Sequence, residues 1–191
     1  MSYKIWLKTK CESVQINRFE NMDAELLYQK LLNHLREQLR RHPRLQIAGL
    51  AIGGAWITKR LARDLSLPQH GVINVAFHRD DYAEKGLAAI RSADTMATHL
   101  PFEVTGAQIV LIDDVLFTGR TVRAALDELF DFGRPAAVEL MVLADRGQRE
   151  LPIAADFVGE HIQLPDTQIL ALEKVTEGTH EIFRFVIEER A

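Results

Sequence analysis

The segment Val110-Leu-Ile-Asp-Asp-Val-Leu-Phe-Thr-Gly-Arg-Thr-Val122 decides the fold of this chain. It begins as an apolar run that ends in two adjacent carboxylates, Asp113 and Asp114, which is the pattern of a buried strand. Small residues then lead into a helix that we expect over about residues 121–132. A strand, a loop and a helix in this order predict one unit of an α/β sheet, in which ligands bind at the carboxyl ends of the strands.

The loop of this segment has the composition of a phosphate site. Thr118, Gly119 and Thr121 allow backbone N–H groups to close around an anion, and the start of the next helix adds its dipole. The two aspartates are acceptors for sugar hydroxyls or ligands for Mg²⁺. A ligand with ribose hydroxyls and a terminal phosphate suits this layout. The alternative interpretation is a buried strand that ends in two solvated aspartates before an ordinary turn.

Other common ligand motifs are missing from the sequence. The segment has no Gly-Lys-Ser or Gly-Lys-Thr, and its acidic residues precede the glycine loop, so it is not a Walker A motif. The Gly-x-Gly-x-x-Gly spacing of dinucleotide-binding folds is also absent. The seven histidines are scattered and do not pair at the spacing of metal ligands.

Outward from this segment, helical and strand-like patterns alternate. Asp23 is a candidate N-cap for a helix up to Arg40, whose apolar face carries Leu27, Leu31, Leu35 and Leu39 and which Pro43 ends. A second helix is expected from Ala55 to Pro68, and short apolar runs predict strands at 46–52, 72–77, 108–112 and 137–143. This order predicts an α/β fold with a doubly wound, mainly parallel sheet flanked by helices.

The length of 191 residues predicts a single domain. We expect an N-terminal extension over residues 1–20, a core over 21–165 and a C-terminal β segment over 166–191, which would form a small added β-rich hood or edge. Residues 78–100 are polar and lack a regular period, as is typical of a functional or mobile loop.

Composition excludes several classes of protein. The chain is 47% hydrophobic and 26% charged, which are ordinary values for a globular protein. No apolar run approaches the length of a membrane span, and the net charge of −4 gives no general attraction to nucleic acid or anionic membranes. The single cysteine, Cys11, is consistent with a reducing cytoplasm, where we expect the protein to reside.

The segment also resembles a known family. Val110 to Val122 is similar to the phosphoribosyl pyrophosphate (PRPP) motif of type I phosphoribosyltransferases, and its wording DDVLFTGRT is similar to that of the PyrR family. Five further stretches resemble this family in the same order: FHRDDY at 77–82, LPFEVTG at 100–106, FGRP at 132–135, DRGQRELPI at 145–153 and DFVG at 156–159. The resemblance covers about residues 23–165.

The resemblance implies a reaction and places residues in it. PyrR proteins regulate pyrimidine genes and are also uracil phosphoribosyltransferases, which convert uracil and PRPP to UMP and pyrophosphate with Mg²⁺. By resemblance, Asp113 and Asp114 bind the ribose hydroxyls and are candidate ligands of Mg²⁺ that is bound with PRPP. The loop that would surround the 5-phosphate consists of Phe117, Thr118, Gly119, Arg120 and Thr121. Ile52, Gly53 and Gly54 fall at the pyrophosphate loop. The alternative for these glycines is a strand-to-helix turn that needs them for close packing.

Residues outside these loops complete the predicted site. The resemblance places Arg79 near the pyrophosphate as a catalytic residue, and Lys85 and Arg91 in a mobile loop that closes over the reactants. Asp145 and Arg146 follow a strand at the same edge of the sheet and are expected near the base or the pyrophosphate.

Two other functions are open at this stage. One is an RNA-binding or nucleotide-sensing transcription attenuator with little catalysis, and the other is a phosphoribosyltransferase for a purine base. An RNA hairpin would need a basic surface, and the candidates are Arg36, Arg40, Arg41, His42 and Arg44, with Arg146 and Arg149. The first five also suit a helix C-terminus, where cations complement the dipole. Self-association into a homodimer or larger assembly is expected by resemblance alone.

Overall fold

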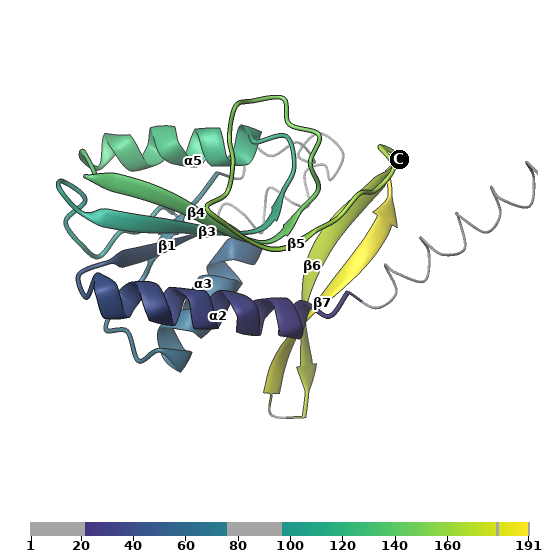
Figure 1. Cartoon of the computed structure of the whole chain (residues 1–191), viewed down its shortest axis with the longest axis horizontal. Helices are drawn as coiled ribbons and strands as arrows, with labels where there is room; N and C mark the ends of the chain where they lie inside the picture. Colours follow the sequence, from purple (N-terminus) through teal and green to yellow (C-terminus); the bar gives the residue numbers. More distant parts are fainter. Residues whose placement is uncertain (1–21, 76–96, 179, 191) are drawn as a thin grey trace, which may run out of the picture.

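The computed structural model describes residues 22–75, 97–178 and 180–190, which form two sheets and three helices (Figure 1). The larger sheet has five parallel strands in the order β2-β1-β3-β4-β5, and β6 and β7 form a separate antiparallel hairpin. In chain order the elements are α2 (Ala24–Arg41), β1 (Gln46–Leu50), α3 (Gly53–Asp64), β2 (Gly71–Ile73), β3 (Gln108–Leu116), α5 (Arg120–Asp131), β4 (Ala137–Asp145), β5 (Phe157–His161), β6 (Gln168–Glu177) and β7 (His180–Glu189).

Helices cover both faces of the parallel sheet (Figure 1). Val110 and Ile112 of β3 pack with α2 and α3, whereas Ile109 and Leu111 point to the opposite face and pack with α5. This alternation follows from the two-residue period of a strand. A strand buried on both faces reads as a continuous apolar run, and the predicted doubly wound α/β fold is confirmed.

The predicted N-cap and buried face of helix α2 are confirmed. The Asp23 carboxylate accepts hydrogen bonds from the N–H groups of Glu25 (2.9 Å) and Leu26 (3.2 Å), which satisfies donors that α2 leaves free at its start. Leu27, Leu31 and Leu35 are buried, as their spacing predicts. Among the described residues, no helix is both long and apolar enough to cross a membrane.

Strand β3 differs from its prediction. The apolar pattern predicts a strand that ends at Ile112, but β3 continues through both aspartates to Leu116. The extension is held on one side by β4, where Asp113 pairs with Val142 and Val115 with Ala144. An apolar pattern ends at the first carboxylate and therefore cannot detect strand residues that line a site.

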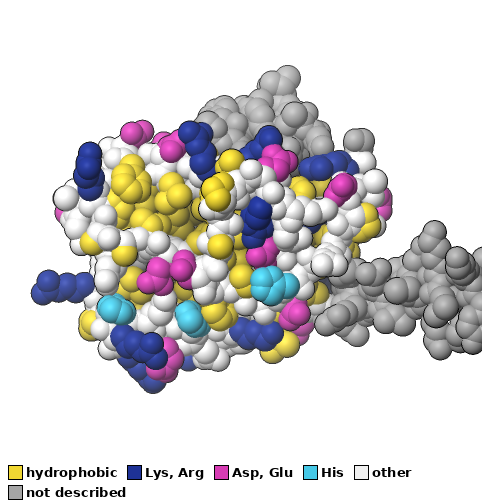
Figure 2. Space-filling view, turned by 45° about the horizontal axis from the view of Figure 1, so that its top comes forward, with side chains coloured by type: hydrophobic (Ala, Val, Ile, Leu, Met, Phe, Trp, Pro, Cys, Tyr) yellow, Lys and Arg dark blue, Asp and Glu magenta, His cyan; other side chains and the backbone are white. Residues whose placement is uncertain are grey.

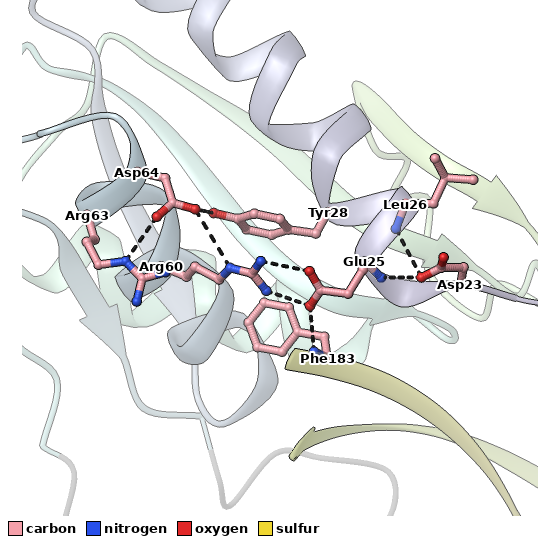
Figure 3. Close-up of polar contacts among 8 residues, drawn as sticks. All are labelled: Asp23, Glu25, Leu26, Tyr28, Arg60, Arg63, Asp64 and Phe183. Carbon is pink, nitrogen blue, oxygen red and sulfur yellow. Dashed lines mark hydrogen bonds and ion pairs between the residues drawn. The ribbon is translucent and has the colours of Figure 1, made fainter. Parts of the chain in front are cut away.

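A partly buried polar cluster fixes the C-terminal hairpin to the helices (Figure 3). Glu25 of α2 accepts two hydrogen bonds from the Arg60 guanidinium of α3 (2.5 and 2.7 Å) and a third from the Phe183 N–H of β7 (2.6 Å). The Arg60 guanidinium also lies over the Tyr28 ring, 4.1 Å from its centroid. The Tyr28 hydroxyl donates to Asp64 (2.7 Å). A two-stranded hairpin is marginal by itself, so this contact supplies part of the support that β6 and β7 need.

The cluster also sets the protonation of its members. Burial raises the pKa of Tyr28 well above its usual value, and the bond to Asp64 raises it further. Burial alone would raise the pKa of Asp64, but hydrogen bonds from Tyr28 and Arg63 and the charge of Arg60 hold this pKa below its usual range. The cluster therefore keeps a neutral phenol beside an ionised carboxylate.

Replacing Glu25 should loosen the hairpin. Glu25→Ala removes all three acceptor contacts and leaves the half-buried Arg60 without its main counter-charge, so we expect a loss of about 2 kcal/mol in the free energy of unfolding, measured in urea. Glu37→Ala is the matched control, because Glu37 is exposed on the same helix and pairs with Arg40; its cost should stay below about 0.5 kcal/mol. Equal effects of the two variants would contradict the role given to Glu25.

Candidate functional site

Buried charge is concentrated at the carboxyl edge of the sheet. Among the described residues, the buried polar or charged side chains are Thr58, Asp113, Asp114, Thr118, Asp145 and Arg146. All of them except Thr58 lie at or just after the carboxyl ends of β3 and β4. Burying charge is costly unless partners compensate it, so this concentration marks the edge as the candidate site.

The two aspartates lie where β3 loses its neighbour on one side. Pairing between β1 and β3 ends at Gly49 and Ile112, whereas β4 continues to pair with the opposite edge of β3. The Asp113 carboxylate accepts a hydrogen bond from the Asp114 N–H (3.0 Å). Both aspartates are more than nine-tenths buried, and the space beside them is bounded by the start of α3.

Gly53 and Gly54 pack directly against this acidic pair. A Cβ atom at Gly53 would lie 2.5 Å from the Asp114 Cγ, and one at Gly54 would collide with the Ile112 carbonyl oxygen and lie 3.1 Å from the Asp113 Cα. The close-packing interpretation of these glycines therefore holds. The same contact brings residues 52–54, expected at the pyrophosphate, beside the residues expected at the ribose.

The loop after β3 has the geometry of an anion site. Gly119 has a φ of 93°, a conformation that favours glycine, and it is the N-cap of α5. The Thr118 hydroxyl accepts a hydrogen bond from the Arg120 N–H (3.3 Å). The first N–H groups of a helix lack partners within the helix and carry the positive end of its dipole, so the start of α5 is a favourable position for an anion.

Arg149 braces this loop. Its guanidinium donates to the carbonyl oxygens of Phe117 (2.5 Å), Gly147 (2.9 Å) and Ile153 (3.0 Å), and it forms an ion pair with Asp145 (2.6 Å). The prediction that Arg149 contributes to an RNA contact is not supported by this geometry, because its donors are used inside the protein. The local sequence carried no signal for this structural role.

Arg146 is in a different situation from Arg149. Its side chain is buried, its Cζ lies 4.2 Å from the centroid of the Phe117 ring, and one N–H reaches the Pro165 carbonyl oxygen at 3.4 Å. Its Nε has no hydrogen-bond partner among the described residues. Burial lowers the pKa of Arg146, and the nearby charge of Arg190 lowers it further. Sequence patterns did not single out Arg190, because it lies far along the chain from every motif.

The structure brings together most of the predicted residues. One edge of the sheet carries both predicted loops and four predicted side chains: residues 52–54, residues 117–121, Asp113, Asp114, Asp145 and Arg146. Arg79, Lys85 and Arg91 lie outside the described residues. Within the described ranges, no group of three or more His, Cys, Asp or Glu side chains could hold a metal ion by itself.

Comparisons with known proteins show the family of this chain. The family model described as "Phosphoribosyl transferase domain" matches residues 17–171. The chain is 52% identical to the bifunctional protein PyrR of Ralstonia nicotianae over 173 residues, which cover 90% of this chain and 97% of that protein. It is 43% identical to the bifunctional protein PyrR of Nitrosococcus oceani over 155 residues, 78% of this chain and 84% of that protein.

Solved structures share the fold at lower identity. The hypoxanthine phosphoribosyltransferase of Trypanosoma cruzi superposes with a TM-score of 0.51 at 16% identity, covering 74% of this chain and 79% of that one. The purine phosphoribosyltransferase of Pyrococcus horikoshii gives 0.51 at 22% identity, covering 72% and 84%. With an extensive family match, close relatives and a common fold, this chain belongs to the PyrR family of type I phosphoribosyltransferases.

Proposed function

We propose that the carboxyl edge of the sheet is the active site of a PRPP-dependent uracil phosphoribosyltransferase. The enzyme converts uracil and PRPP to UMP and pyrophosphate, and as a PyrR protein it is also a regulator of pyrimidine gene expression. One observation carries the assignment of the site: Gly53 lies against the Asp114 carboxylate. This contact joins a turn suited to pyrophosphate to the segment suited to ribose 5-phosphate.

Each part of PRPP then has a place. The 5-phosphate binds at the start of α5, where Thr118 and the backbone of Gly119 to Thr121 supply donors. The ribose hydroxyls donate to Asp113 and Asp114, and the pyrophosphate lies along residues 52–54. When the bond to pyrophosphate breaks, the sugar becomes cationic, and the two buried carboxylates stabilise this charge.

The residues also suit Mg²⁺ that arrives with PRPP. Mg²⁺ usually keeps several waters and is held by one or two carboxylates together with substrate phosphates. Asp113 and Asp114 provide such a pair, and they would hold the ion jointly with PRPP. When bound, Mg²⁺ neutralises charge on the departing pyrophosphate.

Removing the acidic pair should abolish turnover. The double variant Asp113→Asn, Asp114→Asn keeps the shape of the site and removes its charge, so we expect UMP formation from uracil and PRPP to fall by at least roughly a hundredfold. Asp127→Asn is the control, because Asp127 is exposed on α5 and pairs only with Arg123 among the described contacts. Hypoxanthine, guanine and orotate are assayed beside uracil. Turnover with a purine in preference to uracil would overturn the substrate, and no turnover with any base would favour a nucleotide sensor.

The Arg149 brace should matter for PRPP without touching it. In Arg149→Gln the Phe117 carbonyl and Asp145 lose their shared partner, so we expect the KM for PRPP to rise roughly tenfold and the unfolding free energy to fall by about 2 kcal/mol. Arg149→Lys should not rescue either property, because an ammonium cannot reproduce the planar fork. Arg123→Gln on the exposed side of α5 is the control. A fully active Arg149→Gln enzyme would contradict the brace.

An RNA partner, which PyrR regulators bind, has one candidate surface. Arg40, Arg41, His42 and Arg44 are exposed where α2 ends and β1 begins, which is the amino edge of the sheet, opposite the carboxyl edge. Figure 2 shows Lys and Arg side chains scattered among acidic ones on the face it presents, without a continuous basic surface there. We propose this amino-edge cluster as the RNA contact, because its three exposed arginines lie within residues 40–44.

The RNA proposal has a direct test. The double variant Arg41→Gln, Arg44→Gln should bind an RNA hairpin from the leader of a pyrimidine operon more weakly in gel shifts. The salt dependence of its binding constant should also be less steep, because about two fewer counterions are released on binding. The double variant should retain full uracil phosphoribosyltransferase activity. Unchanged binding, or no binding by the parent protein, would remove RNA from this surface.

A further inference from the structure

An acidic residue contacts the phosphate loop, residues 117–121, where the 5-phosphate binds in the proposed function. Glu150 lies in the turn after β4, and its backbone N–H donates to the Thr118 carbonyl oxygen (3.0 Å). The Leu151 N–H donates to the same oxygen (3.2 Å). A carboxylate near a phosphate repels it unless a cation lies beside both groups. The presence of Glu150 at this loop therefore needs an explanation.

The Glu150 carboxylate pairs with a residue of the phosphate loop itself. It accepts a hydrogen bond from the Arg120 Nη2 and forms an ion pair with this side chain. Arg120 is the first residue of α5, and its backbone N–H donates to the Thr118 hydroxyl (3.3 Å). Glu150 thus holds the loop on both sides of Gly119, at residue 118 by its main chain and at residue 120 by its side chain.

The same turn packs against the middle of the loop. A Cβ atom at Gly119 would lie 3.3 Å from the Ile153 Cβ and 3.5 Å from the Leu151 Cβ. These contacts and the two hydrogen bonds to Thr118 fix the loop backbone. The long Arg120 side chain has more conformational freedom than this backbone, and its contact with Glu150 restricts that freedom.

The charges at the start of α5 are unusual for a helix. Its first four residues include Arg120 and Arg123 and no acidic residue, although the positive end of the helix dipole disfavours cations there. Arg123 pairs with Asp127 of the same helix (2.9 Å), whereas Arg120 pairs with Glu150 of a different segment. An anion bound at the helix start would offset the cost of these cations. This arrangement favours a role in binding over a role in helix stability.

The ion pair between Arg120 and Glu150 is too exposed to contribute much to folding. The two side chains are 58% and 50% exposed, and pairs of this kind have a small effect on stability. An arginine side chain loses much rotamer entropy when a ligand fixes it. A partner that orients Arg120 before the phosphate arrives removes part of this cost from binding. The pair is therefore suited to positioning Arg120.

We propose that Glu150 is a positioning residue for the 5-phosphate, which orients the Arg120 guanidinium and thereby favours PRPP and UMP, the reactant and product that carry this phosphate. This inference rests on the proposed function. Glu150 makes no contact with the substrate, because its carboxylate acts through Arg120. Arg149, the preceding residue, acts on a different part of the loop, the Phe117 carbonyl.

A double-mutant cycle tests this inference. Glu150→Gln removes the carboxylate charge and should raise the dissociation constant for UMP, measured by calorimetry, roughly fivefold, which is the upper end of what an exposed ion pair contributes. The KM for PRPP should rise by the same factor, with kcat and the midpoint of urea unfolding unchanged. In the Arg120→Gln background, Glu150→Gln should have no further effect on UMP affinity, because the residue through which it acts is absent.

The control is Asp127→Asn. Asp127 lies in an equally exposed ion pair on α5, and this substitution changes the net charge by the same amount as Glu150→Gln. It should leave the affinity for UMP unchanged. A loss of affinity equal to that of Glu150→Gln would show a general effect of charge and would overturn the role given to Glu150.

The remaining outcomes separate this inference from the function on which it rests. Equal effects of Glu150→Gln with and without Arg120 would show that the carboxylate does not act through Arg120, and tighter binding of UMP would show that it opposes the phosphate. A lower unfolding midpoint with a loss of kcat would assign Glu150 to the fold. Each of these results overturns the inference, while UMP binding by the parent protein still supports the proposed function. If the parent protein neither binds nor forms UMP, the proposed function fails and the inference fails with it.

Discussion

The start of α3 lies so close to β3 that no side chain fits between them, and the site depends on this constraint. Gly53 and Gly54 have no Cβ, so the helix can begin against the Asp114 carboxylate and the Ile112 carbonyl oxygen. The contact sets the distance between two loops that come from separate strands. In the proposed function both loops contact one substrate molecule, and fixing their separation in the folded protein would remove an entropic cost that binding would otherwise have to meet.

Two arginines near the end of β4 show how environment decides what a residue does. Arg149 donates to the Phe117 carbonyl, to Asp145 and to the Ile153 carbonyl of its own loop. It therefore stabilises the conformation of the two loops. The Arg146 guanidinium lies over the Phe117 ring, and its Nε has no hydrogen-bond partner among the described residues. The two belong to one short stretch, and their types alone do not distinguish them. The difference lies in the direction of each side chain and in what the neighbouring loops place beside it.

Much of the fold could be predicted from the sequence, and the limits have physical causes. The capping of α2, its buried leucines and the two-sided burial of β3 follow from local patterns. The predicted length of β3 was wrong, because Asp113 and Asp114 are polar and an apolar pattern ends before them although the strand continues. Local patterns identified the loops at the carboxyl edge, but the brace by Arg149 and the approach of Arg190 depend on tertiary contacts. The roles of all the predicted site residues stay predictions, including those of Arg79, Lys85 and Arg91, and self-association stays a prediction as well.

The hydrogen bond between Glu25 and the Phe183 N–H joins residues 158 positions apart. Closing so long a loop is entropically expensive, and contacts of this kind form late during folding. The strands and helices proposed to hold the phosphate and the ribose lie between residues 46 and 131, and their contacts span shorter separations. We therefore expect this part of the fold to assemble before the hairpin docks. Docking of the hairpin then belongs to the final stage of folding, when the two ends of the described chain come together.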